Sequence, residues 1–379
     1  MITDDDDLYQ TPAEYYVQEC FELAKKALGR TSPNPVVGAI VLDKNGKPIG
    51  KGYHQKAGSE HAEVIAIKEA GELSKGGTLI INLEPCSHFG KTPPCTNLII
   101  KSQINEVIFS NYDPNPLVFK KSEKILLENN IKVIPNVLEA EGKELNKFFF
   151  KWIKTTLPWI SLKQAQTLDG KIALGNGEKR WITSEQSRKE VHLLRNTFDA
   201  VLVGANTVQI DNPQLTVRNI ENGRNPIRII LDSKLMTDPT SKVYENNAQT
   251  ILVTKTGVTK NKINQYKEKN PNLDVIELDE KSKGHLDLRE LFIVLGKKKI
   301  LSVLVEAGPN LAGELIANNL IDEYILFLAP KVFIDTALMS GLKIELQDFK
   351  AKSFEFTFFD HKIIGNDLMV ILRPRGDIQ

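Results

Sequence analysis

Residues 84–95 of this chain read EPCSHFGKTPPC, and residues 59–65, upstream of them, read SEHAEVI. Together the two stretches hold two histidines and two of the chain's three cysteines. With His54 just upstream, this part of the chain carries half of its six histidines. Because histidines and cysteines are scarce in this sequence, their gathering here predicts a functional site.

The sequence around these stretches alternates between predicted strands and predicted helices. Residues 36–54, VVGAIVLDKNGKPIGKGYH, have the pattern of a β-hairpin that turns at Asn45-Gly46. The pattern predicts an α/β domain over residues 13–150, after a disordered acidic tail at residues 1–12. Helices are predicted over residues 12–29, 61–73 and 96–104, strands over residues 77–86, 105–111 and 131–138, and a helical connector over residues 141–158.

A second α/β domain is predicted over residues 151–379. Its strands are predicted at residues 200–204, 227–231, 250–254, 274–278, 300–305, 324–329 and 365–374, with helices at residues 184–198 and 310–320. The fold class predicted for the whole chain is therefore α/β, in two domains.

Length and composition argue against several classes of protein. A chain of 379 residues is long for one hydrophobic core and suits two domains. The 49 basic and 48 acidic residues leave a net charge of +1, which argues against a nucleic-acid partner. No apolar run approaches about 20 residues, and the N-terminus is acidic and unlike a signal peptide. With only three cysteines, the sequence predicts a cytoplasmic protein without a disulfide framework.

His61, Cys86 and Cys95 form a candidate zinc site. An imidazole and two thiolates suit Zn²⁺, and three protein ligands leave the fourth position to water, as in catalytic zinc sites. Bound zinc lowers the pKa of water towards about 7, and Glu63, two residues after His61, is placed to carry the protons. This set matches the H-x-E and P-C parts of the zinc-deaminase motif, except that eight residues instead of two separate the cysteines.

The residues alone leave two alternatives and one geometric conflict open. The three side chains could have a role without a metal. Cys20 as a fourth ligand would make the zinc structural, although its position on the apolar face of a helix predicts a buried small side chain. His61 and Glu63 would point about 200° apart in a regular helix. Both can therefore face one metal only if it lies at the first turn of the helix, where the backbone is half helical.

Three longer motifs, PNPVVGAIV (33–41), GYHQKAGSEHAEV (52–64) and EPCSHFGKTPPC, resemble the deaminase half of the bifunctional riboflavin-biosynthesis deaminase–reductases. The resemblance implies a cytidine-deaminase-like αβα domain with one Zn²⁺ per chain. It implies a diaminopyrimidinone substrate that carries a phosphoribosylamino group. In this family Asn34 and His54 would hold the pyrimidine, while His88 and Lys91 would face the substrate and its phosphate. From the residues alone, a turn role for Asn34, packing for His88 and solvation for Lys91 stay open.

Four motifs in the second half resemble the reductase half of the same enzymes: SLKQAQTLDGKIA (161–173), RWITS (180–184), LVGANTVQIDNPQLTVR (202–218) and VEAGPNLAGELI (305–316). The resemblance implies a dihydrofolate-reductase-like fold and NADPH as the cofactor. The substrate contacts that it implies are Arg195, Leu215, Arg218 and Glu306. The NADPH contacts that it implies are Ala165, Trp181, Thr183, Thr207, Asp211, Ser233, Gly308, Pro309, Asn310, Leu311, Ala312, Gly313 and Glu314.

Lys163 is the catalytic residue that the reductase resemblance implies. It would polarise or protonate the opened ribosyl imine while hydride arrives at the first carbon of the sugar. From the residues alone, a lysine at a strand edge is more often solvated. Lys179, where some members of the family carry a serine, departs from the pattern and is left out of the predicted site.

Two other functions remain possible on the residues alone. One is a cytosine or nucleoside deaminase with a regulatory second domain, and the other is a nucleic-acid-binding module with a structural zinc. The net charge of +1 and an aromatic content of 7% argue against the second. The predicted partners are a small-molecule substrate and further copies of the chain, as a dimer or tetramer, without nucleic acid or membrane.

Overall fold

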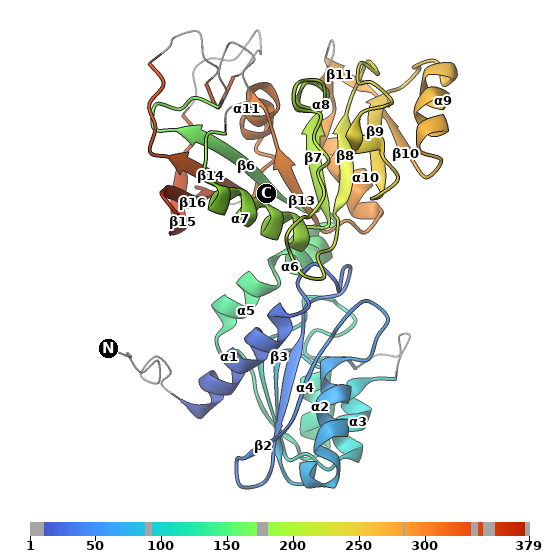
Figure 1. The fold of residues 1–379 in the computed structure, drawn as a ribbon. Coiled ribbons are helices and arrows are strands. Elements are labelled where there is room, and N and C mark those ends of the chain that lie inside the picture. The colour runs from blue at the N-terminus through green and yellow to red at the C-terminus, as the bar shows by residue number, and fades with distance from the viewer. Residues whose placement is uncertain are drawn as a thin grey trace. The chain divides into compact units, whose positions relative to one another are not determined.

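The computed structural model describes residues 11–87, 93–172, 181–282, 285–334, 340–343 and 353–375. The chain divides into two compact units, Met1–Thr156 and Leu157–Gln379 (Figure 1). Each unit has its own sheet and its own hydrophobic core. The first unit includes all of helix α6 (Lys147–Thr155), which a boundary at residue 150 would have divided.

The first unit is built on a five-stranded sheet in the order β2-β1-β3-β4-β5. β1 pairs antiparallel with β2 and with β3, whereas β3, β4 and β5 run parallel. The strands are β1 (Gly38–Leu42), β2 (Pro48–Tyr53), β3 (Thr78–Leu83), β4 (Glu106–Asn111) and β5 (Lys132–Ile134). The predicted hairpin and the predicted strands are all present.

Helices cover both faces of this sheet, so the unit is an αβα sandwich. Alternate strand residues face opposite sides, and the two faces form separate cores. One core includes residues of α2 (Ala62–Ala70), α3 (Cys95–Lys101) and α4 (Lys121–Glu128). The other includes residues of α1 (Pro12–Lys25) and α5 (Glu139–Leu145). Figure 1 shows α1 on one side of the sheet and α2 and α3 on the other.

Helix α1 begins at a capping box. The Thr11 hydroxyl accepts the Glu14 N–H at 3.3 Å, and the Glu14 carboxylate accepts the Thr11 N–H at 2.9 Å. Pro12 is the first residue of the helix, a position at which its missing N–H has no helical partner to lose. Pro12 thus begins α1, as the predicted helix over residues 12–29 has it, and Thr11 caps the helix; the first ten residues of the predicted tail lie outside the described residues.

The second unit is built on a nine-stranded sheet in the order β10-β9-β8-β7-β13-β6-β14-β16-β15. The strands from β10 to β14 are parallel, and β16 and β15 extend the sheet antiparallel. They are β6 (Trp159–Thr167), β7 (Ala200–Gly204), β8 (Ile227–Leu231), β9 (Thr250–Lys255), β10 (Asp274–Leu278), β13 (Ser302–Glu306), β14 (Glu323–Ala329), β15 (Phe356–Ile364) and β16 (Asp367–Pro374).

Helices pack on both faces of the second sheet as well. α10 (Leu288–Lys297) and α11 (Pro309–Ala317) contribute to one core, and α8 (Ala205–Asp211) and α9 (Lys260–Lys269) contribute to the other. α7 (Glu185–Thr197) and a short ribbon of β11 (Glu280–Ser282) with β12 (His285–Leu286) complete the described elements. The predicted strands and helices are present, whereas β6, α8, α9, β11, β12, α10 and β15 were not among them.

Two glycines of β2 allow helix α2 to lie directly against the sheet. A Cβ atom on Gly52 would come within 2.5 Å of the Ala62 carbonyl oxygen, and one on Gly50 within 2.2 Å of the Ala66 carbonyl oxygen. Real Cβ atoms do not approach a backbone oxygen so closely, so any larger residue would displace the helix. The first turn of α2, which follows His61, depends on this contact.

We predict that Gly52→Ala destabilises the first unit by about 1–3 kcal/mol, because the new methyl group overpacks the α2–β2 contact. It should also weaken zinc retention, because the displaced turn follows His61. Urea unfolding and metal analysis measure the two effects. Gly46→Asn is the control, because Gly46 lies in the same hairpin at φ +83° with no atom near its Cβ position, and Asn tolerates that conformation. Equal effects of the two substitutions would contradict this account.

Candidate functional site

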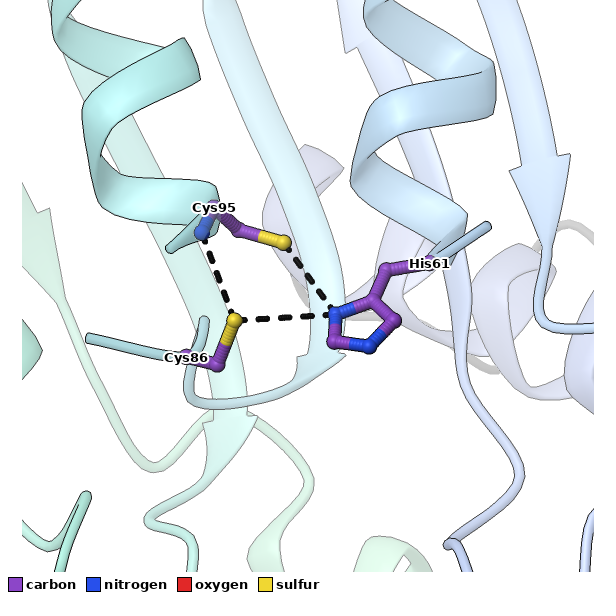
Figure 2. Close-up of side chains that lie close together, drawn as sticks. All are labelled: His61, Cys86 and Cys95. Atoms are coloured by element: carbon purple, nitrogen blue, oxygen red, sulfur yellow. Dashed lines mark hydrogen bonds between the residues drawn. The ribbon is translucent and has the colours of Figure 1, made fainter. Parts of the chain in front are cut away.

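Three side chains converge at one end of the first sheet: His61, Cys86 and Cys95 (Figure 2). His61 is the N-cap of α2, Cys86 follows β3, and Cys95 is the first residue of α3. His61 Nδ1 lies 3.3 Å from Cys95 Sγ and 3.6 Å from Cys86 Sγ. All three donor atoms lie within 4.8 Å of one another. Nδ1 is therefore the histidine nitrogen that faces both sulfurs.

This geometry fits a zinc ion. Tetrahedral zinc with ordinary Zn–S and Zn–N bond lengths holds a sulfur and a nitrogen about 3.6 Å apart, close to both distances here. Within the described part of the chain, the group contains no fourth histidine, cysteine or acidic residue. Cys20 packs in the core between α1 and the sheet, where its thiol donates to the Ile80 carbonyl at 3.4 Å. The alternative of a structural zinc closed by Cys20 is therefore wrong.

Among the protein groups alone, the three donors share protons unequally. The hydrogen bond with Cys95 lowers the pKa of the Cys86 thiol to about 4, and the hydrogen bond with Cys86 raises the pKa of His61 to about 9. The hydrogen bond between Cys86 and Cys95 has the opposite effect on Cys95, whose pKa it raises, and burial raises that pKa further. A thiolate is thus already favoured at Cys86, whereas a metal must displace protons from the other two donors.

Glu63 is buried beside this cluster. Burial raises the pKa of its carboxyl group, and the nearby Cys86 charge raises it further. The geometric conflict between His61 and Glu63 does not arise, because His61 has an extended backbone (φ −73°, ψ 158°) and only the residues after it are helical. A buried carboxyl group with a raised pKa is suited to gaining and losing protons near neutral pH.

Asn34 and His54 lie together next to the cluster. Asn34 Nδ2 is 3.1 Å from His54 Nε2, and the His54 ring lies edge-on to the His61 ring at 5.7 Å. His54 Nδ1 is 3.0 Å from the Glu60 carbonyl oxygen, which only accepts, so Nδ1 carries the proton. Burial lowers the pKa of His54, which favours a neutral ring whose Nε2 accepts from Asn34. His88 and Lys91 lie outside the described residues.

In the second unit, three charged side chains meet, two from the central strands β6 and β13 and one from helix α7. Glu306, the last residue of β13, accepts from Arg195 Nε at 2.6 Å and from Arg195 Nη2 at 3.0 Å. Lys163 Nζ lies 3.8 Å from Glu306 Oε2. Burial alone would raise the pKa of Glu306, but Arg195 and Lys163 outweigh it and lower this pKa to about 2.

Lys163 lies on β6, between β13 and β14 in the middle of the nine-stranded sheet. Its side chain is only 15% exposed, so the alternative of a solvated lysine on a strand edge is wrong. Burial lowers its pKa, as does the charge of Arg195, whereas Glu306 raises it. A buried ammonium with a lowered pKa gives up a proton more readily than a solvated one.

The other predicted substrate contacts, Leu215 and Arg218, lie in a segment that Arg195 also contacts. Arg195 Nη1 donates to the Thr216 carbonyl at 3.3 Å, which ties α7 to residues 215–218. The exposed Arg218 donates to Gln214 Oε1 at 2.9 Å. Leu215, at φ +55°, buries its side chain in the core beneath α8 and α9, so its backbone is the part available to a ligand.

His192 was missed by the sequence analysis. It lies one turn before Arg195 on α7, and its Nδ1 accepts the Arg218 N–H at 3.3 Å. Burial lowers its pKa, and the charges of Arg195 and Arg218 lower it further. Its i, i+3 spacing from Arg195 was the available signal, because residues at that spacing share a helix face.

The predicted cofactor residues follow the carboxyl ends of adjacent parallel strands. Thr207 follows β7, Ser233 follows β8, and Gly308 follows β13 as the N-cap of α11. Ala165 lies in the last third of β6, the other neighbour of β13. Ligands of open α/β sheets bind beyond this edge, and the α11 N-terminus presents free N–H groups there.

Other members of the predicted cofactor set lie on these elements or before α7. Asp211 ends α8, while Pro309, Asn310, Leu311, Ala312, Gly313 and Glu314 form the first part of α11. Trp181 and Thr183 precede α7, and the exposed Trp181 ring stacks on the Arg188 guanidinium at 4.7 Å. Lys331 donates to the Trp181 carbonyl at 3.2 Å.

Family profiles match both units. A profile described as the cytidine and deoxycytidylate deaminase zinc-binding region matches residues 10–111. A second, described as the RibD C-terminal domain, matches residues 158–367. No helix of the described residues has the length and apolar character required to cross a membrane.

Curated relatives match along nearly the whole chain. The riboflavin biosynthesis protein RibD of Aquifex aeolicus is 41% identical over 363 residues, covering 94% of this chain and 97% of the relative. The protein of that name from Escherichia coli is 40% identical, covering 95% of this chain and 98% of the relative.

Solved structures agree with both predicted folds. RibD of Acinetobacter baumannii superposes with a TM-score of 0.86 at 33% identity, covering 96% of this chain and 99% of the other. A Thermotoga maritima deaminase/reductase superposes with a TM-score of 0.83 at 37% identity, with the same coverage. The predicted fold class, a cytidine-deaminase-like domain followed by a reductase domain, is confirmed.

We predict that Cys86→Ser and Cys95→Ser each lose bound zinc, because each removes one of three ligands. Metal analysis after dialysis against a chelator measures the loss. Cys20→Ala is the matched control, since Cys20 is a buried cysteine of the same unit in a different core. Retention of zinc by Cys86→Ser, or its loss from Cys20→Ala, would contradict the assignment.

We predict that Glu306→Gln lowers the free energy of unfolding of the second unit by about 3 kcal/mol at pH 7. Two buried cations would lose their counter-charge. Because the folded pKa of Glu306 lies near 2, below its ordinary value of 4.5, its contribution is complete above pH 4.5. It fades as the pH falls towards 2, so the difference from the unsubstituted protein should shrink between pH 5 and pH 3.

Urea unfolding followed by tryptophan fluorescence across that pH range measures this difference. The control is Glu280→Gln, because Glu280 pairs with Lys255 at 3.6 Å at the surface and should contribute less than about 1 kcal/mol. A difference for Glu306→Gln that stays constant from pH 7 to pH 3 would contradict the prediction.

Proposed function

The chain belongs to the RibD family of riboflavin-biosynthesis proteins, and on that premise we propose which of its residues carry each reaction. It is a bifunctional enzyme. It hydrolytically deaminates 2,5-diamino-6-(5-phosphoribosylamino)pyrimidin-4-one to the corresponding uracil with zinc, and reduces the ribosyl side chain to ribityl with NADPH. A regulatory second domain and a nucleic-acid-binding role are therefore wrong.

Residues 13–150, with the rest of α6 up to Thr156, carry the deamination, and the remainder of residues 151–379 carries the reduction. The zinc-binding profile falls on the first range and the RibD C-terminal profile on the second. His61 Nδ1, Cys86 Sγ and Cys95 Sγ hold the zinc, because these three atoms face one another at the right spacing. Bound zinc acts as a Lewis acid that makes hydroxide available at neutral pH.

Glu63 transfers the protons of the deamination. Its raised pKa allows it to take a proton from the attacking water, hold it, and deliver it to the ring nitrogen and then to the departing amino group. Water adds to the carbon that bears the 2-amino group, and ammonia leaves. Burial excludes bulk water from Glu63, so the proton stays with the reacting groups.

Asn34 and His54 bind the pyrimidine beside the metal. The Asn34 amide is oriented by its bond to His54, and His54 is oriented by the Glu60 carbonyl. Asn34 therefore offers a carbonyl oxygen as well as an N–H to a heteroaromatic ring. His88 and Lys91, between the two cysteine ligands, contact the substrate and its phosphate in this proposal.

Lys163 supplies the proton of the reduction. NADPH, when bound, supplies a hydride to the first carbon of the opened sugar. The imine nitrogen gains a proton as the carbon gains the hydride, and the lowered pKa of Lys163 suits it as the donor. Glu306 holds Lys163 and Arg195 in place, and Arg195 and Arg218 bind the phosphoribosyl arm in this proposal.

NADPH binds beyond the carboxyl ends of β6, β7, β8 and β13. The residues proposed for it are Ala165, Trp181, Thr183, Thr207, Asp211, Ser233 and Gly308 to Glu314. The strand order β8-β7-β13-β6 supports this assignment, because it brings the ends of these strands to one edge. The N-terminus of α11 adds N–H groups and a positive helix end for a phosphate.

The enzyme works in the cytoplasm as a homo-oligomer, a dimer or a tetramer. A reducing compartment keeps Cys86 and Cys95 available as thiolates. Among the described strands, β15 ends the nine-stranded sheet, and its Phe358 and Ile363 are 82% and 78% exposed. An apolar strand edge of this kind is suited to burial against a second copy.

The convergence of His61, Cys86 and Cys95 beside buried Glu63 is the observation that carries this proposal. We predict that Glu63→Gln retains zinc but slows ammonia release by about 10²–10⁴-fold, because the proton carrier is lost. NADPH oxidation with the deaminated intermediate should be unchanged. Lys163→Met should show the reverse, with normal ammonia release and slow NADPH oxidation.

The measurement follows ammonia and NADPH absorbance together, with the diaminopyrimidinone substrate and with the deaminated intermediate. Each variant is the control for the other, because each leaves the second reaction of the same chain as a measure of folding. Full deamination by Glu63→Gln would contradict its role, as would full reduction by Lys163→Met.

A further inference from the structure

The side chains of two buried asparagines, Asn82 and Asn146, form hydrogen bonds with the backbone of residues 36–38 in the deaminase unit. Asn146 Oδ1 accepts the Val36 N–H at 2.8 Å, and Asn146 Nδ2 donates to the Val36 carbonyl at 3.0 Å. Asn82 Nδ2 donates to the same carbonyl at 3.0 Å, and Asn82 Oδ1 accepts the Gly38 N–H at 2.7 Å. Exposure is 0% for Asn82, 5% for Asn146 and 6% for Val36, so water does not compete for these bonds.

These hydrogen bonds lie where the backbone pairing between β1 and β3 stops. β1 and β3 pair from Ala39 opposite Ile81 to Leu42 opposite Thr78. The next position would place Gly38 opposite Asn82, and here the Asn82 side chain takes over from the backbone ladder. Asn146 comes from the junction of α5 and α6, 110 residues along the chain from Val36. The asparagine side chains thus hold a stretch that pairs with β2 at Gly38 but is beyond the pairing with β3.

The segment held by the asparagines is linked to both residues proposed to bind the pyrimidine, Asn34 through the chain and His54 through hydrogen bonds. Asn34 lies two residues before Val36 and contacts His54 at 3.1 Å. The next residue, Val37, accepts the His54 N–H through its carbonyl at 2.9 Å. His54 in turn packs against the ring of His61. A shift of the Val36 backbone would therefore move Asn34 and His54 relative to the metal ligands.

We propose that Asn82 and Asn146 are positioning residues of the deaminase, which set the substrate affinity by fixing Asn34 and His54 beside the metal centre. This inference rests on the proposed role of Asn34 and His54 in binding the pyrimidine. The asparagines touch neither the metal ligands nor Glu63 in any recorded hydrogen bond of the described residues. Their loss should thus act on substrate binding and leave the metal in place.

The test measures kcat, KM and zinc content for Asn82→Ala and Asn146→Ala in the full chain. KM for the diaminopyrimidinone substrate should rise about tenfold, the size expected when a buried hydrogen bond is lost and its partner left unpaired. Zinc content should stay at one per chain, and NADPH oxidation with the deaminated intermediate should be unchanged.

Asn111→Ala is the matched control. Asn111 is a buried asparagine of the same unit that also grips backbone, since its Nδ2 donates to the Glu139 carbonyl at 2.9 Å. It makes no recorded contact with residues 34–38. It should lower the stability of the unit by a similar amount while leaving KM unchanged, which separates positioning from general destabilisation.

A milder substitution keeps the proposal testable if Asn146→Ala does not fold. Asn146→Ser keeps a small neutral side chain with a hydroxyl, a residue type favoured before a helix, and places no charge beside the Val36 carbonyl. It should fold, bind zinc and raise KM by a smaller factor than the alanine substitution.

A double substitution of Asn146 and Asn34 distinguishes this inference from the proposed binding role of Asn34 and His54, on which it rests. If Asn146 acts through Asn34, then Asn146→Ala should raise KM in the unsubstituted chain but change it little in an Asn34→Ala chain. A normal KM for Asn34→Ala and His54→Ala would overturn their proposed role in binding. A raised KM for those two, with Asn82→Ala and Asn146→Ala behaving like Asn111→Ala, would overturn only the positioning inference.

Discussion

Two helix N-termini and the end of one strand meet where His61, Cys95 and Cys86 bring their donor atoms within 4.8 Å of one another. Two thiols and an imidazole this close favour proton sharing, and their arrangement suits a cation that replaces those protons. The packing of α2 against the first sheet helps to position these donor atoms. The glycines of β2 let α2 approach the sheet, so that His61 can precede a helix that begins directly against β2.

A carboxylate has the corresponding role in the second unit. Glu306 balances Arg195 and Lys163 in the middle of the nine-stranded sheet, where an unpaired charge of either sign would be costly. The arrangement holds a lysine with a lowered pKa next to the strand ends proposed to receive NADPH. Burial thus shifts the pKa of the proposed proton carrier in each unit, upward at Glu63 and downward at Lys163.

Much of the fold could be predicted from local patterns. Hydrophobic alternation and Asn45-Gly46 identified the hairpin, and most strands of both sheets were found because buried parallel strands read as short apolar runs. β6 was not among the predicted strands. α9 was missed because its sequence is mostly lysine and asparagine, with Ile263 and Tyr266 as its two buried contacts. β15 was missed because most of its residues are exposed at the sheet edge, so its sequence lacks a buried face.

By itself, the sequence determined the family and the types of metal ligand, and it predicted a role for Glu63, because motif spacing and residue chemistry are local properties of the chain. Tertiary structure alone decided the surroundings of those residues. Lys163 is buried rather than solvated because β13 and β14 flank its strand, and Leu215 turns its side chain into the core. The hydrogen bonds of Asn146 with Val36 join residues 110 positions apart. No local pattern encodes this contact, because only the folded chain brings the two residues together.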